Sequence, residues 1–309
     1  MSHSRRTFVK AAAAGAGALV LARPGYAADE AAGDVLSRVG VALYTVRDQL
    51  KTRPKETLKT ISDMGYRYIE GGNPEVWKAA KEVGLKQVSD YAPTYLITGN
   101  RAAWAATPDA VMLPEGYTWE KAVDDAKARG LEYFIVVYLQ KAERGGLDVY
   151  KGLAAKLNKA GETCKKAGLQ LGYHPHNFEY EVIAGQRPID VLLKETDPKL
   201  LALELDVFWS SIAGVSPTRM LAEYKGRVPL LHMKDLSKGT PVQFDNETVP
   251  HGAFTEVGNG SVDFAAVLKA APAAGARYYY VEQDYSTGDP LESLRTSYAT
   301  LKKLAGGRG

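Results

Sequence analysis

The sequence has little of what several classes of protein require. It contains one cysteine, Cys164, among 309 residues, which excludes an internal disulfide and any zinc-ribbon framework. The formal net charge is only +3, too small for a nucleic-acid-binding surface. Apolar residues make up 45% and charged residues 24% of the chain, so it is neither disordered nor of low complexity. These absences leave a globular protein with a sizeable core.

The N-terminus lacks a run long enough to span a bilayer. Residues 11–21 are uncharged, but a transmembrane helix needs about 20 apolar residues. The preceding residues 5–10 (RRTFVK) resemble a twin-arginine export signal, and small residues at Ala27 and Ala28 suit cleavage. We therefore predict a cleaved signal peptide at residues 1–28, the twin-arginine export machinery as a partner, a periplasmic mature protein and no stable membrane insertion.

Cleavage would also remove most of the positive charge. Residues 1–27 hold four of the 39 basic residues and none of the 36 acidic ones, which leaves 35 against 36 and a net charge of −1. A charge near zero argues against DNA, RNA or anionic membranes as partners. A lone cysteine also suits the oxidising periplasm, because no intramolecular mispairing can occur.

Beyond residue 37, short β-branched or aromatic runs alternate with amphipathic stretches. The predicted strands are residues 39–44, 66–70, 85–89, 133–138, 169–174, 201–206, 228–232 and 277–282. The predicted helices include residues 55–64, 119–128, 147–167, 217–224, 262–273 and 290–304. A glycine stands between helix and strand at positions 65, 84, 130, 168, 226 and 275, where a left-handed helix cap belongs.

Eight alternations of strand and helix predict parallel strands with crossover helices. We therefore assign residues 37–306 to a single-domain α/β fold, a (β/α)8 TIM barrel. The alternative is a doubly wound open sheet, but residues 44–48 (YTVRD), which follow the first strand, contain no glycine-rich phosphate turn. Residues 90–116 and 237–258 are predicted to be long insertions after strands three and seven.

Polar residues gather where the predicted strands end, the face of such a barrel that carries the chemistry. Strand five ends in residues 173–181 (YHPHNFEYE), strand six in 204–209 (ELDVFW), strand seven in 232–235 (HMKD) and strand eight in 282–284 (EQD). Three of the four histidines left after export lie at these ends.

Four of these side chains could meet at one level of the barrel. His174, Asp206, His232 and Glu282 would each come from a different neighbouring strand, and alternation turns residues two apart to the same side. Two imidazoles and two carboxylates suit one divalent manganese, zinc, iron or cobalt ion. The alternative for the two carboxylates is a salt bridge to Lys234 or Arg47.

At these residues the chain resembles the xylose-isomerase-like TIM-barrel superfamily, and the resemblance covers nearly all of the mature chain. It rests on VALYTVRDQL, LGYHPHNFEYE, LELDVFWSSIAGVSP, RVPLLHMKDL, EVGNGSVDF and YYYVEQDY. Together these are similar to the exported branch labelled sugar phosphate isomerase/epimerase.

The resemblance implies one divalent metal held by four ligands from strands five to eight. It assigns Asp206, His232 and Glu282 to three of them. At the fourth position this sequence has His174 where sugar epimerases carry a glutamate that is both ligand and base. Endonuclease relatives hold three zinc ions through many histidines, and the four histidines of the mature chain are too few to bind them.

The implied chemistry is abstraction of the proton next to a sugar carbonyl, with the metal stabilising the enediolate. The candidate bases are His176, Glu282 and Glu181. The candidate substrate-binding residues are Tyr44, Arg47, Trp209, Lys234 and Glu256. The turn at residues 258–260 could bind a hydroxyl or phosphate through its backbone N–H groups, or be an ordinary helix entry.

Three functions follow as hypotheses, each with a small-molecule sugar or glycoside as partner. The first is a metal-dependent carbohydrate isomerase/epimerase. The second is a lyase that expels the aglycone of a 3-keto-glycoside by β-elimination, which both export and the missing strand-five glutamate favour. The third, from another class, is a periplasmic sugar-binding protein without catalysis, against which the retained ligands argue.

Overall fold

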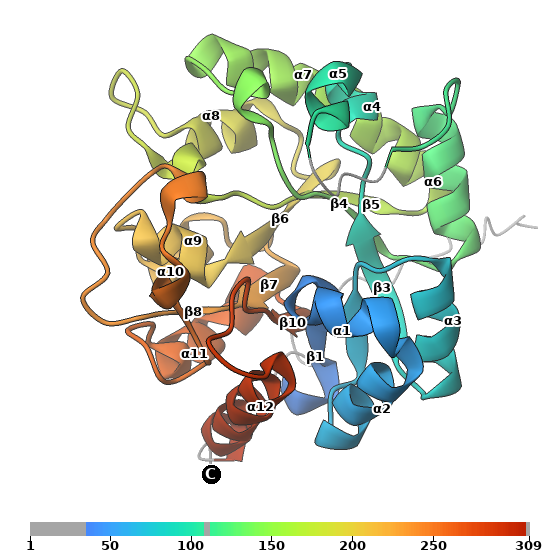
Figure 1. The fold of residues 1–309 in the computed structure, drawn as a ribbon. Helices are drawn as coiled ribbons and strands as arrows, with labels where there is room; N and C mark the ends of the chain where they lie inside the picture. Colours follow the sequence, from blue (N-terminus) through green and yellow to red (C-terminus); the bar gives the residue numbers. More distant parts are fainter. Residues whose placement is uncertain (1–34, 108–111, 307–309) are drawn as a thin grey trace, which may run out of the picture.

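The strands of the computed structural model form a closed parallel barrel (Figure 1). The structure describes residues 35–107 and 112–306, so the predicted signal peptide lies outside the described residues. Around the barrel the order is β1, β10, β7, β6, β5, β4, β3 and β2, and every neighbouring pair is parallel. The predicted (β/α)8 barrel is confirmed, and closure excludes the open doubly wound sheet.

All eight predicted strands are present. The barrel strands are β1 (Val39–Ala42), β2 (Tyr68–Glu70), β3 (Lys86–Tyr91), β4 (Tyr133–Val136), β5 (Gln170–Tyr173), β6 (Leu201–Asp206), β7 (Leu230–Met233) and β10 (Tyr278–Val281). A two-stranded antiparallel sheet joins β8 (Asp235–Leu236) to β9 (Phe254–Thr255). The helices are α1 (Arg47–Thr52), α2 (Pro54–Met64), α3 (Pro74–Glu82), α4 (Tyr95–Thr98), α5 (Arg101–Ala105), α6 (Trp119–Ala128), α7 (Leu147–Ala167), α8 (Pro188–Glu195), α9 (Val207–Ile212), α10 (Pro217–Glu223), α11 (Phe264–Ala274) and α12 (Pro290–Gly306).

Most strand boundaries differ from the prediction by one or two residues, and two of the differences affect the loops around the site. Strand β3 runs on to Tyr91, because Asp90 and Tyr91 pair with β4, so the insertion starts later than residue 90 and carries α4 and α5. Strand β5 stops at Tyr173, and a 3₁₀ turn at Asn177–Tyr180 follows. His176 therefore lies outside the strand, in the loop above it.

Alternation along the strands divides the barrel into an outer and an inner layer. In β6, Leu201, Leu203 and Leu205 pack into the main core between sheet and helices. The residues between them, including Glu204 and Asp206, face the barrel interior because successive side chains point to opposite faces. The same strand thus supplies apolar residues outward and carboxylates inward.

Apolar and tyrosine side chains fill part of the barrel interior. The charged groups described below therefore lie toward the carboxyl ends of the strands, which we call the upper end of the barrel. The inner cluster contains Ala42, Val88, Tyr133, Ile135, Leu230, Tyr278 and Tyr280. Gly40 makes room for it, since a Cβ there would lie 2.8 Å from the Tyr280 ring. The carboxyl ends of the strands are left for the site, as expected for this fold.

The glycine caps are confirmed. Positive φ angles occur at all six predicted positions, residues 65, 84, 130, 168, 226 and 275, a conformation that glycine adopts without a steric penalty. Within the described residues, no helix combines the length and apolarity needed to cross a membrane.

Candidate metal centre and its surroundings

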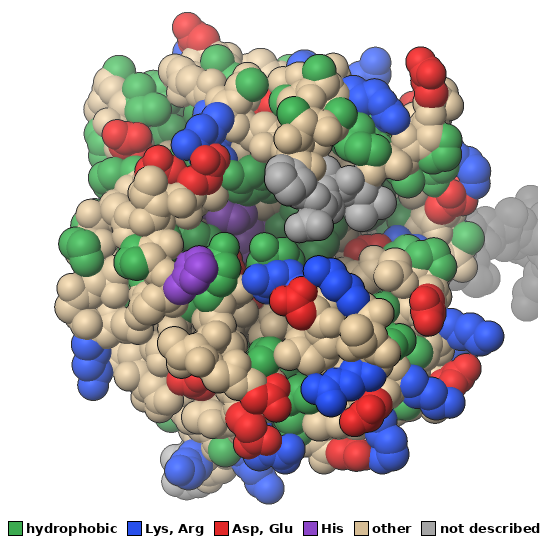
Figure 2. Space-filling view, viewed as in Figure 1, with side chains coloured by type: hydrophobic (Ala, Val, Ile, Leu, Met, Phe, Trp, Pro, Cys, Tyr) green, Lys and Arg blue, Asp and Glu red, His purple; other side chains and the backbone are tan. Residues whose placement is uncertain are grey.

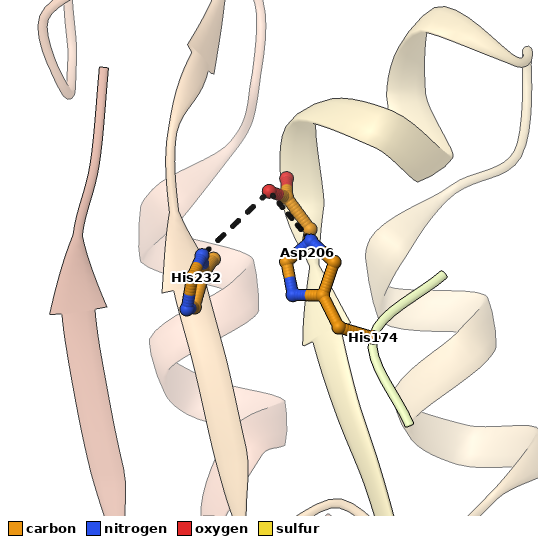
Figure 3. Close-up of side chains that lie close together, drawn as sticks. All are labelled: His174, Asp206 and His232. Atoms are coloured by element: carbon orange, nitrogen blue, oxygen red, sulfur yellow. Dashed lines mark ion pairs between the residues drawn. The ribbon is translucent and has the colours of Figure 1, made fainter. Parts of the chain in front are cut away.

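Three of the predicted ligands meet at the upper end of the barrel (Figure 3). His174 follows β5, Asp206 ends β6 and His232 lies in β7, and both imidazoles turn toward the Asp206 carboxylate. His174 Nε2 lies 3.7 Å and His232 Nδ1 lies 4.0 Å from Asp206 Oδ2. Asp206 and His232 are direct neighbours in the β6–β7 register. At most 2% of any of these residues is exposed.

Local structure fixes the orientation of Asp206. Its Oδ1 accepts hydrogen bonds from the backbone N–H groups of Phe208 at 2.7 Å and Trp209 at 3.1 Å, which makes it the N-cap of α9. Its Oδ2 has no hydrogen-bond partner among the described residues, although the Lys234 Nζ lies 3.2 Å away. One oxygen is therefore committed to the fold and the other is turned into the site.

Glu282 joins the cluster from the end of β10. Its Oε2 lies 3.0 Å from His232 Nδ1 and 2.7 Å from Lys234 Nζ. Lys234, which is 1% exposed, also lies 2.5 Å from Asp284 Oδ1. The salt-bridge alternative of the sequence analysis is thus present alongside the predicted ligand set, because one ammonium contacts two of the proposed ligands.

Two glutamates that the sequence analysis did not single out lie behind the histidines. Glu70 Oε2, at the end of β2, is 2.7 Å from His232 Nε2, and Glu204 Oε2 is 3.1 Å from His174 Nδ1. Both side chains are fully buried, and the second oxygen of each has no hydrogen-bond partner in the described structure. A carboxylate on the far nitrogen is how proteins orient a metal-binding histidine. The signal in the sequence was an acid within each otherwise apolar strand.

Crowding of charge shifts the pKa values of this cluster in opposite directions. Burial alone would lower the pKa of His232, but Glu204, Glu282 and Glu70 outweigh it and raise that pKa. Burial, reinforced by His232, lowers the pKa of His174. Burial also raises the pKa of Glu204, and nearby Glu70 adds to the effect.

The acidic groups around Lys234 respond to its charge. Burial would lower the pKa of Lys234, yet Asp206, Asp284 and Glu282 raise it, so the amine stays charged. Burial would raise the pKa of Glu282, but Lys234 and His232 lower it. Burial raises the pKa of Asp206 against the opposing effect of Lys234.

The residues fit a divalent transition metal. Two ligands of one ion can be at most about 4.2 Å apart when each bond is about 2.1 Å long, and the distances of 3.0, 3.7 and 4.0 Å within the set satisfy this limit. Mixed imidazole and carboxylate donors suit zinc, manganese, iron or cobalt. Within the described ranges, Lys234 is the only lysine or arginine paired with the five carboxylates at positions 70, 204, 206, 282 and 284, so a second cation would reduce a large negative excess.

His176 lies beside the cluster in an aromatic surround. Its ring stacks on Phe178 with centroids 5.8 Å apart and lies 4.8 Å from Trp209 and 5.2 Å from His174. Burial, together with the charge of Lys234, lowers the pKa of His176, so the ring is neutral at pH 7. Trp209 contacts both this imidazole and the Lys234 ammonium, whose Nζ lies 5.2 Å from the indole centroid. Figure 2 shows histidine in a hollow on this face of the molecule.

Tyr44 and Arg47, two of the candidate substrate-binding residues, directly follow β1 at the carboxyl end of the barrel. The Arg47 guanidinium lies 4.0 Å from the centroid of the Tyr44 ring. It donates a hydrogen bond to the backbone oxygen of Asp284 at 2.9 Å. This bond connects the loop after β1 to the loop after β10.

Glu181 and Glu256 do not join the cluster. Glu181 is exposed, and the acid that this loop buries is Glu179, which accepts hydrogen bonds from Tyr173 Oη at 2.7 Å and the backbone N–H of His176 at 2.8 Å. Glu256 accepts hydrogen bonds from the side chains of Thr255, Asn259 and Ser293, which tie the loop to α12. Glu256 is thus held by hydrogen bonds within the protein, and Glu181 lies exposed in the loop after β5.

The turn at residues 258–260 is also occupied by the protein itself. The buried Asp235 carboxylate accepts hydrogen bonds from the backbone N–H groups of Gly258 at 2.8 Å and Gly260 at 2.9 Å. It takes two more from Leu236 and Val262. The donors that we expected to bind a hydroxyl or phosphate therefore bind Asp235, which supports the alternative of a structural helix entry.

Comparison with known proteins gives the same fold. A family model described as Xylose isomerase-like TIM barrel matches residues 58–304. The solved structure of a sugar phosphate isomerase/epimerase from Parabacteroides distasonis superposes with a TM-score of 0.68 at 21% identity, covering 86% of this chain and 98% of that chain. The IOLI protein with a binding zinc atom superposes with a TM-score of 0.65 at 13% identity, covering 88% of this chain and 99% of that chain. Identities this low establish similarity of fold alone.

Curated relatives match part of the chain. The inosose dehydratase of Clostridium perfringens is 32% identical over 152 residues, which cover 46% of this chain and 50% of that protein. The chain thus spans about half the length of the curated relatives it matches.

Proposed function

The chain belongs to the xylose isomerase-like TIM barrel family, and from that premise we propose that it is a lyase acting on a keto-sugar or keto-glycoside. In this reaction a base of the protein takes the proton next to the carbonyl, the bond between the β carbon and its oxygen substituent breaks, and the proton passes to the departing oxygen, which leaves as water or an alcohol. The relatives are named for enzymes, an inosose dehydratase and a sugar phosphate isomerase/epimerase, and a dehydratase expels water in an elimination of this kind.

The ligands of the metal would be His174, Asp206, His232 and Glu282. A divalent ion held there would act as a Lewis acid on the sugar carbonyl and stabilise the negative charge that develops when the proton leaves. Glu70 and Glu204 hold the far nitrogens of the two histidines. These contacts fix the ring orientations before the substrate arrives, which lowers the cost of ordering the site.

We assign proton abstraction to His176. Its ring is neutral because burial lowers its pKa, and its Nδ1 has no hydrogen-bond partner within the described structure. Contacts with Phe178 and Trp209 hold the ring beside His174. A base must lie within hydrogen-bond reach of the carbon acid, and a sugar bound at the four ligands would lie next to this ring.

Elimination is favoured over epimerisation because the site offers too few free proton acceptors for epimerisation. Epimerisation through opposite faces of the sugar needs two acid–base groups. Strand five offers His174 instead of a carboxylate, and Glu282 is engaged by His232 and Lys234. Outside the four ligands and the carboxylates that contact the two histidines, this leaves His176, whose Nδ1 has no hydrogen-bond partner within the described structure, as the base beside the site. Elimination needs no second base on the opposite face.

Isomerisation is the second candidate, because a single base can also return the proton to the neighbouring carbon. The two reactions differ in their products. Elimination releases the β substituent and forms an unsaturated ketone, whereas isomerisation keeps every substituent and moves a hydrogen between adjacent carbons.

The test uses the mature protein loaded in turn with Mn²⁺, Zn²⁺, Fe²⁺ and Co²⁺. Each form is incubated in D₂O with inosose and with a 3-keto-β-glucoside carrying a p-nitrophenyl group, and NMR follows the α-carbon deuterium and the released group. We expect exchange and release in wild type and their loss, together with the metal, in Asp206→Asn. The matched control is Asp148→Asn, whose carboxylate is 93% exposed on α7. Absence of both exchange and release with every metal would overturn the proposal, and exchange without release would favour isomerisation.

We further propose that the chain acts in the periplasm after twin-arginine export of its folded, metal-loaded form. The support is the RRTFVK sequence at residues 5–10. Fractionation of cells that produce wild type or the double variant Arg5→Lys/Arg6→Lys tests this. Retention of the double variant in the cytoplasm is expected, and equal export of both proteins would contradict it.

A further inference from the structure

A row of stacked planar groups borders the mouth of the barrel. The Arg47 guanidinium lies 4.0 Å from the Tyr44 ring centroid and 5.7 Å from that of Tyr285. The His251 ring stacks on Tyr285 with centroids 3.6 Å apart and an angle of 13° between the planes. Tyr44 is 46% and Tyr285 37% exposed, so two of the few exposed large hydrophobic side chains of the described structure lie close to the Arg47 guanidinium.

This row is continuous with the proposed metal centre. Tyr285 is three residues after the ligand Glu282, and Asp284 between them contacts both Lys234 and, through its backbone oxygen, Arg47. A second bond, from the backbone N–H of Gln283 to Thr45 Oγ1 at 3.0 Å, holds the two loops together. A sugar at the four ligands would therefore extend its remaining substituent over the row.

The charges around the row disfavour a phosphate as that substituent. Arg47 hydrogen-bonds to the backbone oxygens of Tyr44 and Asp284 and pairs with no carboxylate in the described part of the chain. The neighbouring Asp284, which is not one of the four ligands, would repel a dianion. The turn at residues 258–260, which we expected to bind a hydroxyl or phosphate, donates its backbone N–H groups to Asp235 instead.

An aromatic ring fits these groups better. Ring faces and a guanidinium plane attract another aromatic ring through offset stacking and cation–π contact. Exposed aromatic surface that is ordered by stacking and by backbone hydrogen bonds is already arranged for such a partner, which reduces the entropy lost on binding.

We propose that Tyr44, Arg47 and Tyr285 form a binding subsite for a planar aromatic group carried by the sugar, so that the substrate is an unphosphorylated aryl glycoside. This inference rests on the proposed function, because it takes the sugar to bind at the four ligands. It adds the class of the group that is expelled, an aromatic alcohol.

The test compares binding of phenyl β-D-glucoside and methyl β-D-glucoside to the metal-loaded protein by isothermal titration calorimetry. Neither has a keto group, so binding is measured without turnover. Wild type is expected to bind the phenyl glucoside about tenfold more tightly, the gain of roughly one aromatic stack plus one cation–π contact. Tyr285→Ala should reduce this preference to near unity, and Tyr285→Phe should keep it. Val182→Ala, at a 64% exposed residue, is the control for a surface truncation.

Three results would overturn the subsite. The first is that wild type binds the two glucosides equally, or binds neither measurably. The second is an unchanged preference in Tyr285→Ala. The third is tighter binding of glucose 6-phosphate than of phenyl glucoside. Failure of the proposed function is recognised separately: keto-sugars would then show neither deuterium exchange nor release of a substituent, while the phenyl preference stays intact. Exchange that persists without a phenyl preference would reject the subsite alone.

Discussion

Replacing Lys234 by methionine tests whether the buried ammonium and the divalent metal neutralise the same carboxylates. Lys234 Nζ lies 3.2 Å from Asp206, 2.7 Å from Glu282 and 2.5 Å from Asp284. Removing one partner of a buried ion pair costs about 3–5 kcal/mol, because the opposite charge stays buried and unpaired. At roughly 2–4 °C per kcal/mol for a domain of this size, the metal-free Lys234→Met variant should melt on the order of 10 °C below wild type.

Saturating metal should reduce this difference by more than half. An ion bound to Asp206 and Glu282 neutralises two of the three carboxylates, which leaves Asp284 as the unpaired group. The variant should also bind the ion more tightly than wild type does, since no ammonium competes for the two ligand oxygens.

The assay is differential scanning calorimetry in EDTA and in saturating Mn²⁺, with metal affinity measured by titration calorimetry. Lys225→Met, at an exposed lysine, controls for the change of residue type and should shift neither melting curve. A melting deficit of equal size with and without metal, or weaker metal binding in the variant, would refute the reasoning that ammonium and metal share these ligands.

Three more predictions concern the stability of the fold. Gly152→Ala in α7 should raise the free energy of unfolding by about 0.5–1 kcal/mol, since its Cβ meets open space; Gly161→Ala in the same helix should lower it by about 1–3 kcal/mol, since its Cβ would lie 2.8 Å from the Leu200 oxygen. Urea denaturation distinguishes the two, and equal effects would contradict the packing argument. Burial raises the pKa of Glu179 to about 8, above its unfolded value, so the folded state binds this proton more tightly. The free energy of unfolding should therefore fall by up to about 1.4 kcal/mol per pH unit as the pH rises from about 4.5 to 8. Glu179→Gln should flatten that slope, and an unchanged slope in the variant would reject this prediction. Asp235→Asn should cost about 2–4 kcal/mol, because an amide nitrogen cannot accept the backbone hydrogen bonds that the carboxylate receives; a urea midpoint within experimental error of wild type would count against this capping role.

The carboxylates that contact His174 and His232 keep both imidazole rings ordered. His232 contacts Glu70 on one ring nitrogen and Glu282 on the other, so its orientation does not depend on the metal. The same holds for His174, which Glu204 holds at Nδ1. We therefore expect the metal to bind a preformed site, with affinity set by charge more than by rearrangement.

The sequence by itself determined the strands, the helices and the end of the barrel at which the proposed ligands lie. Apolar runs place the strands, six of which follow a glycine cap, and alternation within a run such as residues 201–206 decides which side chains face inward. Because all parallel strands end at one face, His174, Asp206 and His232 could be placed together without coordinates. These features are local, since each depends on residues close together in the chain.

Only the tertiary structure decided which distant groups meet. Closing the barrel brings Glu70 from β2 within 2.7 Å of His232 in β7, although 162 residues separate them, and it places Lys234 among three carboxylates. It also joins the Asp235 carboxylate to the turn at residues 258–260, which removed that turn from the site. The physical reason is that the periodicity of a strand fixes the direction of a side chain, whereas its partners depend on register and closure, which arise from the packing of the whole barrel.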